Sequence, residues 1–485
     1  MNLHALEAQG ESLHQELGRE YYLTGAGHKT DAAFEAIYAR HPALQSDDAL
    51  ESARASGSRE LLEWIVGLRV GRAVAGVEER QLAWEQAAVV RFDGGQVPYL
   101  RLPIELANLE DRGARSALDA ARAAMVAVEL TPIRRERVRG EREVLNGLGY
   151  PDYQAAVSEL SGIDLAALAA EADRFLVATA DLYRDALAQV ARRRLDAVPL
   201  TALVRADAAW VFRARAFDAV FPAGSIVPLA ERQMAELGLD ATQGGRVVFD
   251  IEERPGKQPR AFCVPVRVPE EVYLVVRPRG GHADYRTFWH ELGHALHYAS
   301  VEPSQSFAAR WLGDNSVTEG FAMLWDHMTV DRAWLARYGA LSRRDADALA
   351  FEFAVHELYA VRRYAAKLGY ELVLHSGTDA APDEYAERLT RATLFRYTGD
   401  DYLADVDPWF YAARYLRAWQ LEAGMAADLT ARFDEDWYRN PRAGPYLQAY
   451  MSRGQATAAD RLAEVATGRR LSFEPLVTRL ERLLG

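Results

Sequence analysis

The sequence of 485 residues contains a single cysteine, Cys263, so no disulfide can form within the chain. A protein without disulfides suits a reducing compartment, where thiols stay reduced. The first twenty residues carry several acidic side chains and lack the continuous apolar core of a secretory signal peptide. No stretch approaches the ~20 apolar residues that a membrane-spanning helix needs. We therefore expect a cytoplasmic protein without a membrane partner.

Clustered positive charge is also lacking. Lys and Arg together number 57 against 70 Asp and Glu, which gives a formal net charge of −13 with no basic run. Phosphate binding needs a basic face, so nucleic acid is not an expected partner. The 49% of apolar residues and 26% of charged residues are typical of an ordinary globular protein with a large core.

Apolar residues recur at three- and four-residue spacing through most of the chain, which is typical of amphipathic helices. The longest such pattern, 163–195, continues for about nine turns. Similar patterns predict further helices near 104–130, 342–371, 382–397 and 408–433. The fold is therefore expected to be mainly α. Because 485 residues exceed one typical core, we expect either two lobes or one large elongated unit. Two lobes would be an N-terminal helical lobe at 1–205 and a second lobe at 206–485, with an approximate boundary.

Two segments break the helical periodicity. The stretch "AAVVRFDGGQVPYLRLP", residues 87–103, predicts two short strands around an Asp-Gly-Gly turn. In 245–278, runs of Val, Ile, Phe and Tyr alternate with Pro and Gly, which predicts a small antiparallel sheet. Gly280 and Gly281 follow it directly, so the sheet should lead into the next helix.

That helix contains "TFWHELGHALHY", residues 287–298, and Asp284 is its predicted N-cap. His290 and His294 lie four residues apart on one face, where two imidazoles can share a metal ion at ~2.0–2.1 Å. Glu291 points off that axis and can take a proton from water there without being a ligand. Among eleven histidines, such a motif would arise by chance with a probability of roughly a few per cent.

A catalytic zinc site needs a third protein ligand and keeps a fourth position for water. Glu319 follows His294 by 25 residues, in the first turn of another predicted helix at 314–328. As a carboxylate on a second helix, it would complete a His2Glu site. Alternatively, Ser316 and Glu319 form a capping box, in which Glu319 only reaches back to the Ser316 amide.

Three neighbouring side chains are further candidates for a role at the metal site, each with an alternative interpretation. His297 could bind metal, but a fourth protein ligand would close the site, so a packed or hydrogen-bonded histidine is expected. Asp326 and His327 lie about two turns beyond Glu319. Either could orient a metal ligand through a hydrogen bond, or both could lie on a solvated helix face.

Three segments together, "FDIEERPGKQPRAFC", "TFWHELGHALHY" and "SVTEGFAML", resemble the thimet oligopeptidase and oligoendopeptidase F family of zinc peptidases. The run of residues that this family commonly shows before its zinc helix is matched here by Asp250, Arg254, Gly256, Lys257, Ala261 and Phe262. The resemblance covers 245–485 well and the first half loosely. It implies a helical protein with two lobes around a deep cleft, in which 206–485 is the catalytic lobe. It also implies one zinc ion, bound by His290, His294 and Glu319, and short peptide substrates.

The resemblance assigns further roles in substrate binding and catalysis. The strand edge at Ala261 and Phe262 would supply main-chain hydrogen bonds to an extended peptide. In the family, a late helix contributes a histidine, a glycine-rich turn and several tyrosines that help to stabilise the oxyanion. The matching segment here, 405–422, contains Tyr411 and Tyr415.

The same segment also departs from the family pattern. The third tyrosine position holds Ala418, the histidine position falls near Val406, and the glycines are absent. An alternative interpretation of the tyrosines is a core stripe, because they repeat with Trp419 at four-residue spacing. Arg414, directly before Tyr415, completes a pair that resembles an Arg-Tyr pair of angiotensin-converting enzyme, a related zinc dipeptidyl carboxypeptidase.

The predicted function is zinc-dependent hydrolysis of short peptides, with Glu291 as general base. Two alternatives stay open. One is a carboxypeptidase or dipeptidyl carboxypeptidase on a related helical fold, in which Arg414 or Arg417 would hold the free carboxylate. The other is a non-catalytic helical protein that keeps zinc. A His2Glu site also accepts cobalt or manganese.

Overall fold

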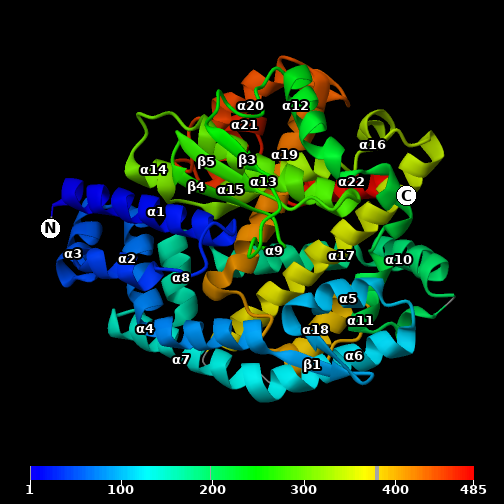
Figure 1. Ribbon diagram of the computed structural model, residues 1–485, viewed down its shortest axis with the longest axis horizontal. Coiled ribbons are helices and arrows are strands. Elements are labelled where there is room, and N and C mark those ends of the chain that lie inside the picture. Colours follow the sequence, from blue (N-terminus) through cyan, green and yellow to red (C-terminus); the bar gives the residue numbers. More distant parts are fainter. Residues whose placement is uncertain (1, 197, 377–381) are drawn as a thin grey trace. The chain divides into compact units, whose positions relative to one another are not determined.

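The computed structural model describes residues 2–196, 198–376 and 382–485, and most of them are helical, as predicted (Figure 1). They form two compact units. The first comprises Met1–Ile65, Arg215–Ala350 and Arg414–Arg479, and the second comprises Val66–Ala214, Phe351–Ala413 and Leu480–Gly485. The units thus interleave along the chain, whereas the sequence-based prediction placed one boundary near residue 205. Among the described residues, no helix combines the length and the apolar character needed to cross a membrane.

The first unit contains the histidine helix, a three-stranded sheet and the helices around them. Its α-helices are α1 (Leu3–Gly25), α2 (Phe34–Arg40), α3 (Asp47–Ser56), α12 (Ile226–Leu237), α13 (His282–Ser300), α14 (Phe307–Trp311), α15 (Asn315–Met328), α16 (Arg332–Tyr338), α20 (Ala443–Met451) and α21 (Ala459–Thr467). Its short 3-10 helices are η1 (Pro42–Gln45), η5 (Arg215–Val220), η6 (Ala223–Ser225) and η9 (Trp437–Arg439). Residues of four further helices are divided between the units, namely α4 (Arg59–Ala87), α17 (Arg343–His375), α19 (Tyr411–Phe433) and α22 (Glu474–Leu484).

Helices and one β-hairpin are the regular elements among the described residues of the second unit. Its helices are α5 (Leu102–Asn108), α6 (Arg112–Met125), η3 (Val126–Leu130), α7 (Thr131–Gly147), α8 (Tyr153–Ser161), α9 (Leu165–Ala178), α10 (Ala180–Arg194), α11 (Arg205–Val211) and α18 (Pro382–Thr393), with 3-10 turns η2 (Tyr99–Arg101), η4 (Leu200–Ala202), η7 (Gly399–Asp401) and η8 (Pro408–Phe410). The predicted hairpin is confirmed as β1 (Val89–Phe92) and β2 (Gly95–Pro98). It turns through Asp93 and Gly94, both with positive φ.

Two of the predicted helices are interrupted. The segment 163–195 forms α9 and α10, which separate at the fully buried Thr179. The Thr179 hydroxyl donates to the carbonyl of Phe175, 2.8 Å away, and such back-bonding bends helices. The segment 104–130 divides because Asp111 caps a new helix, accepting the amide of Ala114 at 2.6 Å.

The sheet of the first unit is mixed, which corrects the antiparallel arrangement predicted for 245–278. Its strands are β3 (Val247–Asp250), β4 (Phe262–Arg267) and β5 (Glu271–Val275), in the order β3-β5-β4. β4 and β5 form an antiparallel hairpin, but β3 pairs with β5 in parallel. β5 occupies the centre because Val272 and Leu274 are completely buried, and β4 is left at an edge.

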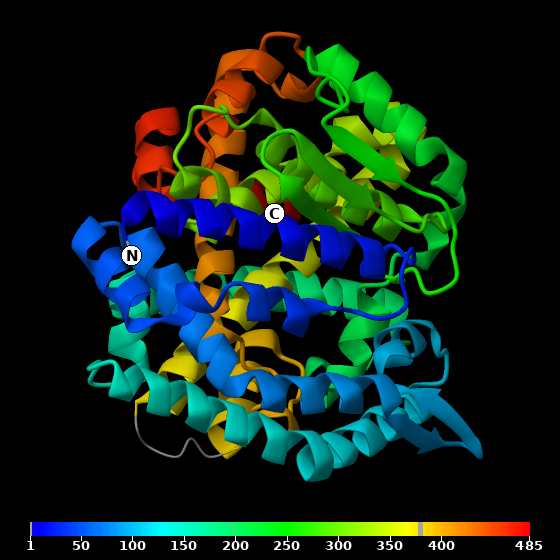
Figure 2. The ribbon, with the colours of Figure 1, turned by 60° about the vertical axis from the view of Figure 1, so that its left-hand side comes forward.

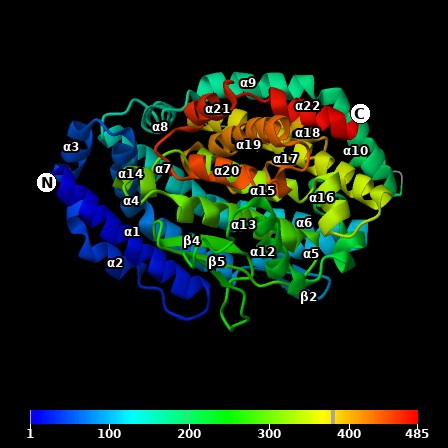
Figure 3. The same cartoon turned by 90° about the horizontal axis from the view of Figure 1, so that it is seen from above.

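Helix α1 lies along the sheet on the side of β4, as Figures 2 and 3 show from two directions. The contact requires glycine at two positions of the helix. A β-carbon at Gly18 would lie 2.5 Å from the carbonyl oxygen of Pro265, and one at Gly25 would lie 2.7 Å from the ring of Phe262. Ala26 and the partly buried Tyr22 then complete an apolar cluster with Phe262.

Candidate metal centre

Helix α13 carries the histidine motif and begins at a glycine. Its N-cap is Gly281, with φ 94°, a conformation that glycine adopts readily. The predicted cap, Asp284, instead lies in the first turn and accepts the amides of Arg279 at 2.5 Å and Gly280 at 2.8 Å. The prediction for Asp284 was wrong because its carboxylate reaches backwards to the loop rather than forwards into the helix.

Helices α13 and α15 approach each other at the glycine of the motif. A β-carbon at Gly293 would lie 2.6 Å from Cα of Ala322 and 2.6 Å from the ring of Trp325, so any side chain here would push the helices apart. Phe288 and Leu292 of α13 are completely buried. This close crossing brings the first turn of α15 next to the two histidines.

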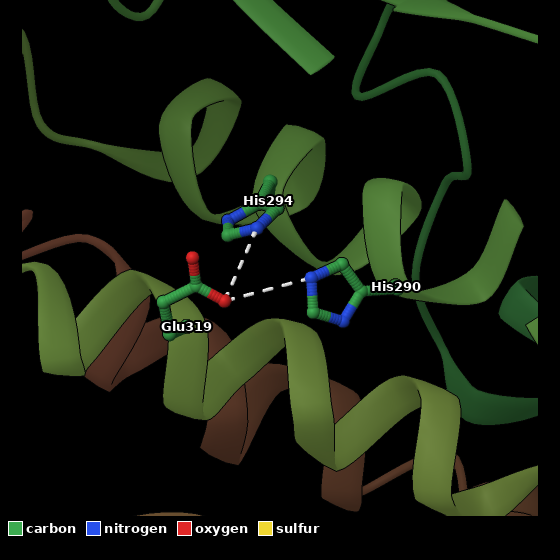
Figure 4. A group of neighbouring side chains, drawn as sticks. All are labelled: His290, His294 and Glu319. Atoms are coloured by element: carbon green, nitrogen blue, oxygen red, sulfur yellow. Dashed lines mark ion pairs between the residues drawn. The ribbon is translucent and has the colours of Figure 1, made fainter. Parts of the chain in front are cut away.

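The three predicted metal ligands converge at this crossing (Figure 4). Oε2 of Glu319 lies 3.5 Å from Nε2 of His290 and 3.8 Å from Nε2 of His294. Ligand atoms placed ~2.0–2.1 Å from a tetrahedral zinc ion are about 3.3–3.4 Å apart, which is close to these two distances. All three atoms lie within 4.8 Å of one another, so the donor set could hold one metal ion. Glu319 is 6% exposed, which shields the site on this side.

The capping-box alternative for Glu319 is wrong. The N-cap of α15 is Asp314, whose carboxylate accepts the amide of Ser316 at 3.0 Å. Arg417 holds Asp314 in turn, at 2.9 Å. Because Ser316 lies inside the helix, Glu319 has no capping role there and its carboxylate faces the histidines.

The other nitrogen of each histidine ring has its own partner on α15. Nδ1 of His290 lies 2.9 Å from Oδ2 of Asp326, and Nδ1 of His294 lies 2.9 Å from Oγ1 of Thr318. Both contacts direct Nε2 towards the common centre, as is usual for histidines that bind metal. The orienting role considered for Asp326 agrees with this contact. Thr318 was missed, and its position directly before Glu319 was the only signal in the sequence.

Carboxylates in this cluster favour positive charge at the centre. Burial disfavours the protonated form of His290, but Asp326 and Glu319 outweigh this effect and raise the pKa of His290 to about 10. Burial lowers the pKa of His294 to about 4. Burial also opposes the charge of Asp326, yet Arg286 and His327 hold its pKa well below its usual range. The charge balance therefore suits a bound cation.

Glu291 lies between the ligands and the edge strand β4. Burial raises the pKa of Glu291 to about 7, against the lowering effects of His290 and of the Cys263 amide, which donates to its carboxylate. The sheet edge thus fixes the carboxylate through a main-chain hydrogen bond. A carboxylate with a pKa near neutrality can both accept a proton and return it.

The predicted substrate strand is the beginning of β4. Ala261 and Phe262 are 7% and 9% exposed, with the Phe262 ring packed edge-on against Tyr21 at 5.1 Å. Their side chains therefore belong to the core. Their predicted main-chain contacts with a peptide stay a prediction.

The residues predicted on the late helix are distributed between the two units. Arg414 belongs to the first unit, where it is buried and forms an ion pair with Glu63. Tyr415 is half-buried, with its ring 6.2 Å from that of Trp419. Tyr411, the first residue of α19, falls in the second unit. The roles of Arg414, Tyr415 and Tyr411 stay predictions.

His297 and His327 are both buried. His297 packs between α13 and α15, 4.9 Å from the ring of Phe321, as expected for a packed histidine. His327 continues the network behind Asp326, since its Nε2 lies 3.4 Å from Oδ1 of Asp326 and its Nδ1 lies 2.9 Å from Glu422. The alternative of a solvated helix face for Asp326 and His327 is therefore wrong.

Comparison with known proteins adds no relative: no model of a protein family matches this chain, and neither does any curated protein. The resemblance to the thimet oligopeptidase and oligoendopeptidase F family accordingly stays a prediction from motifs.

Proposed function

We propose that this protein is a zinc-dependent metallopeptidase that hydrolyses short peptides. The observation that carries the proposal is the convergence of three ligand atoms, Nε2 of His290, Nε2 of His294 and Oε2 of Glu319, beside a buried glutamate that is not a ligand. A purely structural zinc site closes all four positions with protein ligands and needs no such base.

A bound zinc ion would supply Lewis acidity, which polarises a peptide carbonyl and makes a water molecule more acidic. Within this chain, Glu291 would accept the proton from the attacking water and hand it to the departing amine. The amide of Cys263 keeps the Glu291 carboxylate in place during both transfers. Asp326 and Thr318 hold the two imidazoles in the orientation that leaves Nε2 towards the ion.

The proposed setting is the cytoplasm, with one zinc ion per chain and short peptides as the partners. The lone Cys263 and the net charge of −13 support a reducing compartment and argue against nucleic acid. The resemblance of the motifs, in which the edge strand β4 precedes the zinc helix, supports peptides as the substrates.

The test combines metal analysis with peptide cleavage. Purified protein should contain one zinc ion per chain by elemental mass spectrometry, and it should cut a mixed-length peptide library at internal bonds of short members. Glu291→Gln should keep zinc and lose activity by roughly 10²–10⁴-fold, since a positioned base contributes about that much. Glu302→Gln, an exposed position just after α13, is the matched control and should keep both properties.

Other outcomes would contradict the proposal in recognisable ways. Products shortened stepwise from the C-terminus would favour the carboxypeptidase alternative. One bound zinc with no cleavage of any peptide would favour the non-catalytic alternative. Loss of zinc from Glu291→Gln would contradict the role of this residue as a base.

A further inference from the structure

A cavity of about 360 Å³ lies in the first unit, within the ~300–1,000 Å³ range of ligand pockets. Helix α1 contributes His14, Leu17 and Tyr21 from one face, at positions three and four residues apart. Aromatic side chains of α2 and α14 line a second part of the cavity. Pro265 of β4 and Tyr298 of α13 line the rest. Two of these elements, α13 and β4, also contribute residues to the metal centre.

Three residues of the cavity wall, Tyr298, Tyr21 and Pro265, lie near the metal centre, the first through a hydrogen bond and the other two by proximity. Thr318, which orients His294, also forms a hydrogen bond with the Tyr298 hydroxyl. Burial raises the pKa of Tyr21, and the nearby charge of Glu291 contributes to the shift. Pro265 follows Cys263, the residue whose amide donates to Glu291, by two positions on β4. The cavity thus adjoins the proposed base and one proposed zinc ligand.

The wall of the cavity is aromatic and uncharged. The His14 ring is stacked between Trp64 at 5.5 Å and Trp311 at 5.2 Å, and burial lowers the pKa of His14 to about 4, so the ring is neutral at pH 7. No Asp, Glu, Lys or Arg is among the described residues that line the space. Burying an unpaired charge here would be costly, whereas a large apolar side chain would gain contacts with the rings.

The cavity is held in shape by one contact outside its wall and by one contact within it. Arg19, on α1, donates two hydrogen bonds to the carboxylate of Glu271 on β5, at 2.6 and 2.7 Å. Gly18 allows the backbone of α1 to contact Pro265 directly. A pocket whose walls are fixed in advance binds a side chain at a smaller entropic cost than a pocket that must form.

We propose that this cavity binds a bulky uncharged side chain, aromatic residues above all, of the peptide residue next to the cleaved bond. The inference rests on the peptidase function proposed above and names its substrate class. Leu17, in the middle of the α1 wall, is the specificity-determining residue, because a larger side chain there fills the space.

The first experiment measures binding and needs no turnover. A single Phe is moved along an otherwise alanine peptide, and affinities for zinc-loaded Glu291→Gln protein are measured by calorimetry. At one position Phe should bind roughly 10- to 100-fold more tightly than Ala, as expected for burial of one large apolar side chain, and Lys there should bind no better than Ala.

The most direct test compares the protein with a variant in which a larger side chain fills the cavity. Leu17→Trp should lower affinity for the Phe peptide by roughly 10-fold or more and leave the alanine peptide unchanged. The matched control is Leu3→Trp, the same exchange at a 41% exposed position of α1, which should change neither. Equal binding of Phe and Ala at every position, or an equal loss for both peptides in Leu17→Trp, would overturn the assignment.

Cleavage of a peptide library separates this inference from the proposed function. Enrichment of aromatic residues at one position beside the cut, lost in Leu17→Trp, would support both. Cleavage with no such preference would overturn the cavity assignment alone. Phe-dependent binding without cleavage of any peptide would overturn the peptidase function and leave the cavity as a binding site for peptide side chains.

Discussion

Oδ2 of Asp326 lies 2.9 Å from Nδ1 of His290, so α15 orients a proposed metal ligand that α13 carries. Asp326 is 6% exposed, and Arg286 contacts its other oxygen at 3.3 Å. The same helix supplies Glu319, two turns earlier, as a proposed ligand. One helix thus both completes the donor set and fixes the orientation of a ligand on its neighbour.

Removal of the Asp326 carboxylate should weaken the metal site. In Asp326→Ala, the His290 ring loses its acceptor, and zinc affinity should fall by about 10- to 100-fold. Competition with a chelator of known affinity measures the change. Asp347→Ala is the control, since it removes only a half-exposed carboxylate 3.3 Å from Arg332, and surface pairs of this kind contribute little. Equal affinity of both variants would show that Asp326 does not support the ligand.

Thr318 should affect zinc through its hydroxyl rather than its shape. Thr318→Val keeps the volume but removes the acceptor that lies 2.9 Å from Nδ1 of His294, so zinc affinity should fall by about 10-fold. Thr318→Ser retains the hydroxyl and should restore most of the affinity. A valine variant that binds zinc as tightly as the unchanged protein would show that the hydrogen bond to His294 does not support this histidine.

Gly293 should be required for the packing of α13 on α15. A β-carbon at this position meets the backbone of Ala322 at 2.6 Å, so Gly293→Ala should lower the free energy of unfolding by about 1–3 kcal/mol and weaken zinc binding as well. Gly76→Ala in α4 has open space around it and should raise the free energy of unfolding by about 0.5–1 kcal/mol. Urea denaturation of the two variants compares them. A stable Gly293→Ala protein with normal zinc affinity would refute the close crossing.

Acid should destabilise the protein through Asp250. Burial opposes its charge, but hydrogen bonds from Arg254 and Lys257 lower the pKa of Asp250 to about 2. Because an unfolded aspartate has a pKa of ~3.9, the charged form contributes stability above about pH 4 and loses that contribution as the pH falls towards 2.

The Asp250→Asn variant isolates this contribution. At pH 7 it should be less stable by about 1.5–3 kcal/mol, because hydrogen bonds to a charged group are lost. Its stability should also decline less than that of the unchanged protein between about pH 5 and pH 2.5. Urea denaturation at several pH values measures both effects, and parallel pH profiles would contradict the assignment.

Local spacing was sufficient to single out the three residues of the candidate metal site, which the structure brings together. The helical period places His290 and His294 on one face whatever surrounds them, and the three parts of the motif string pointed to Glu319. The same local reasoning was wrong for Asp284 as a cap and for Ser316 in a capping box. The Asp284 carboxylate accepts amides of the preceding loop instead, and Asp314 is the cap of α15 in place of Ser316. Both outcomes depend on the path of the neighbouring backbone, which the local pattern does not specify.

Periodicity and turn residues over short distances were sufficient to predict the mainly α fold, the hairpin at 87–103 and the face that carries the histidines. Contacts between distant segments were needed to show that β3 pairs in parallel with β5, that Asp326 and Thr318 orient the histidines, and that α1 lines a cavity beside β4. These features join residues up to hundreds of positions apart. The cavity and the histidine site also depend on how closely α1 packs on β4 at Gly18 and α13 packs on α15 at Gly293, which no local pattern specifies.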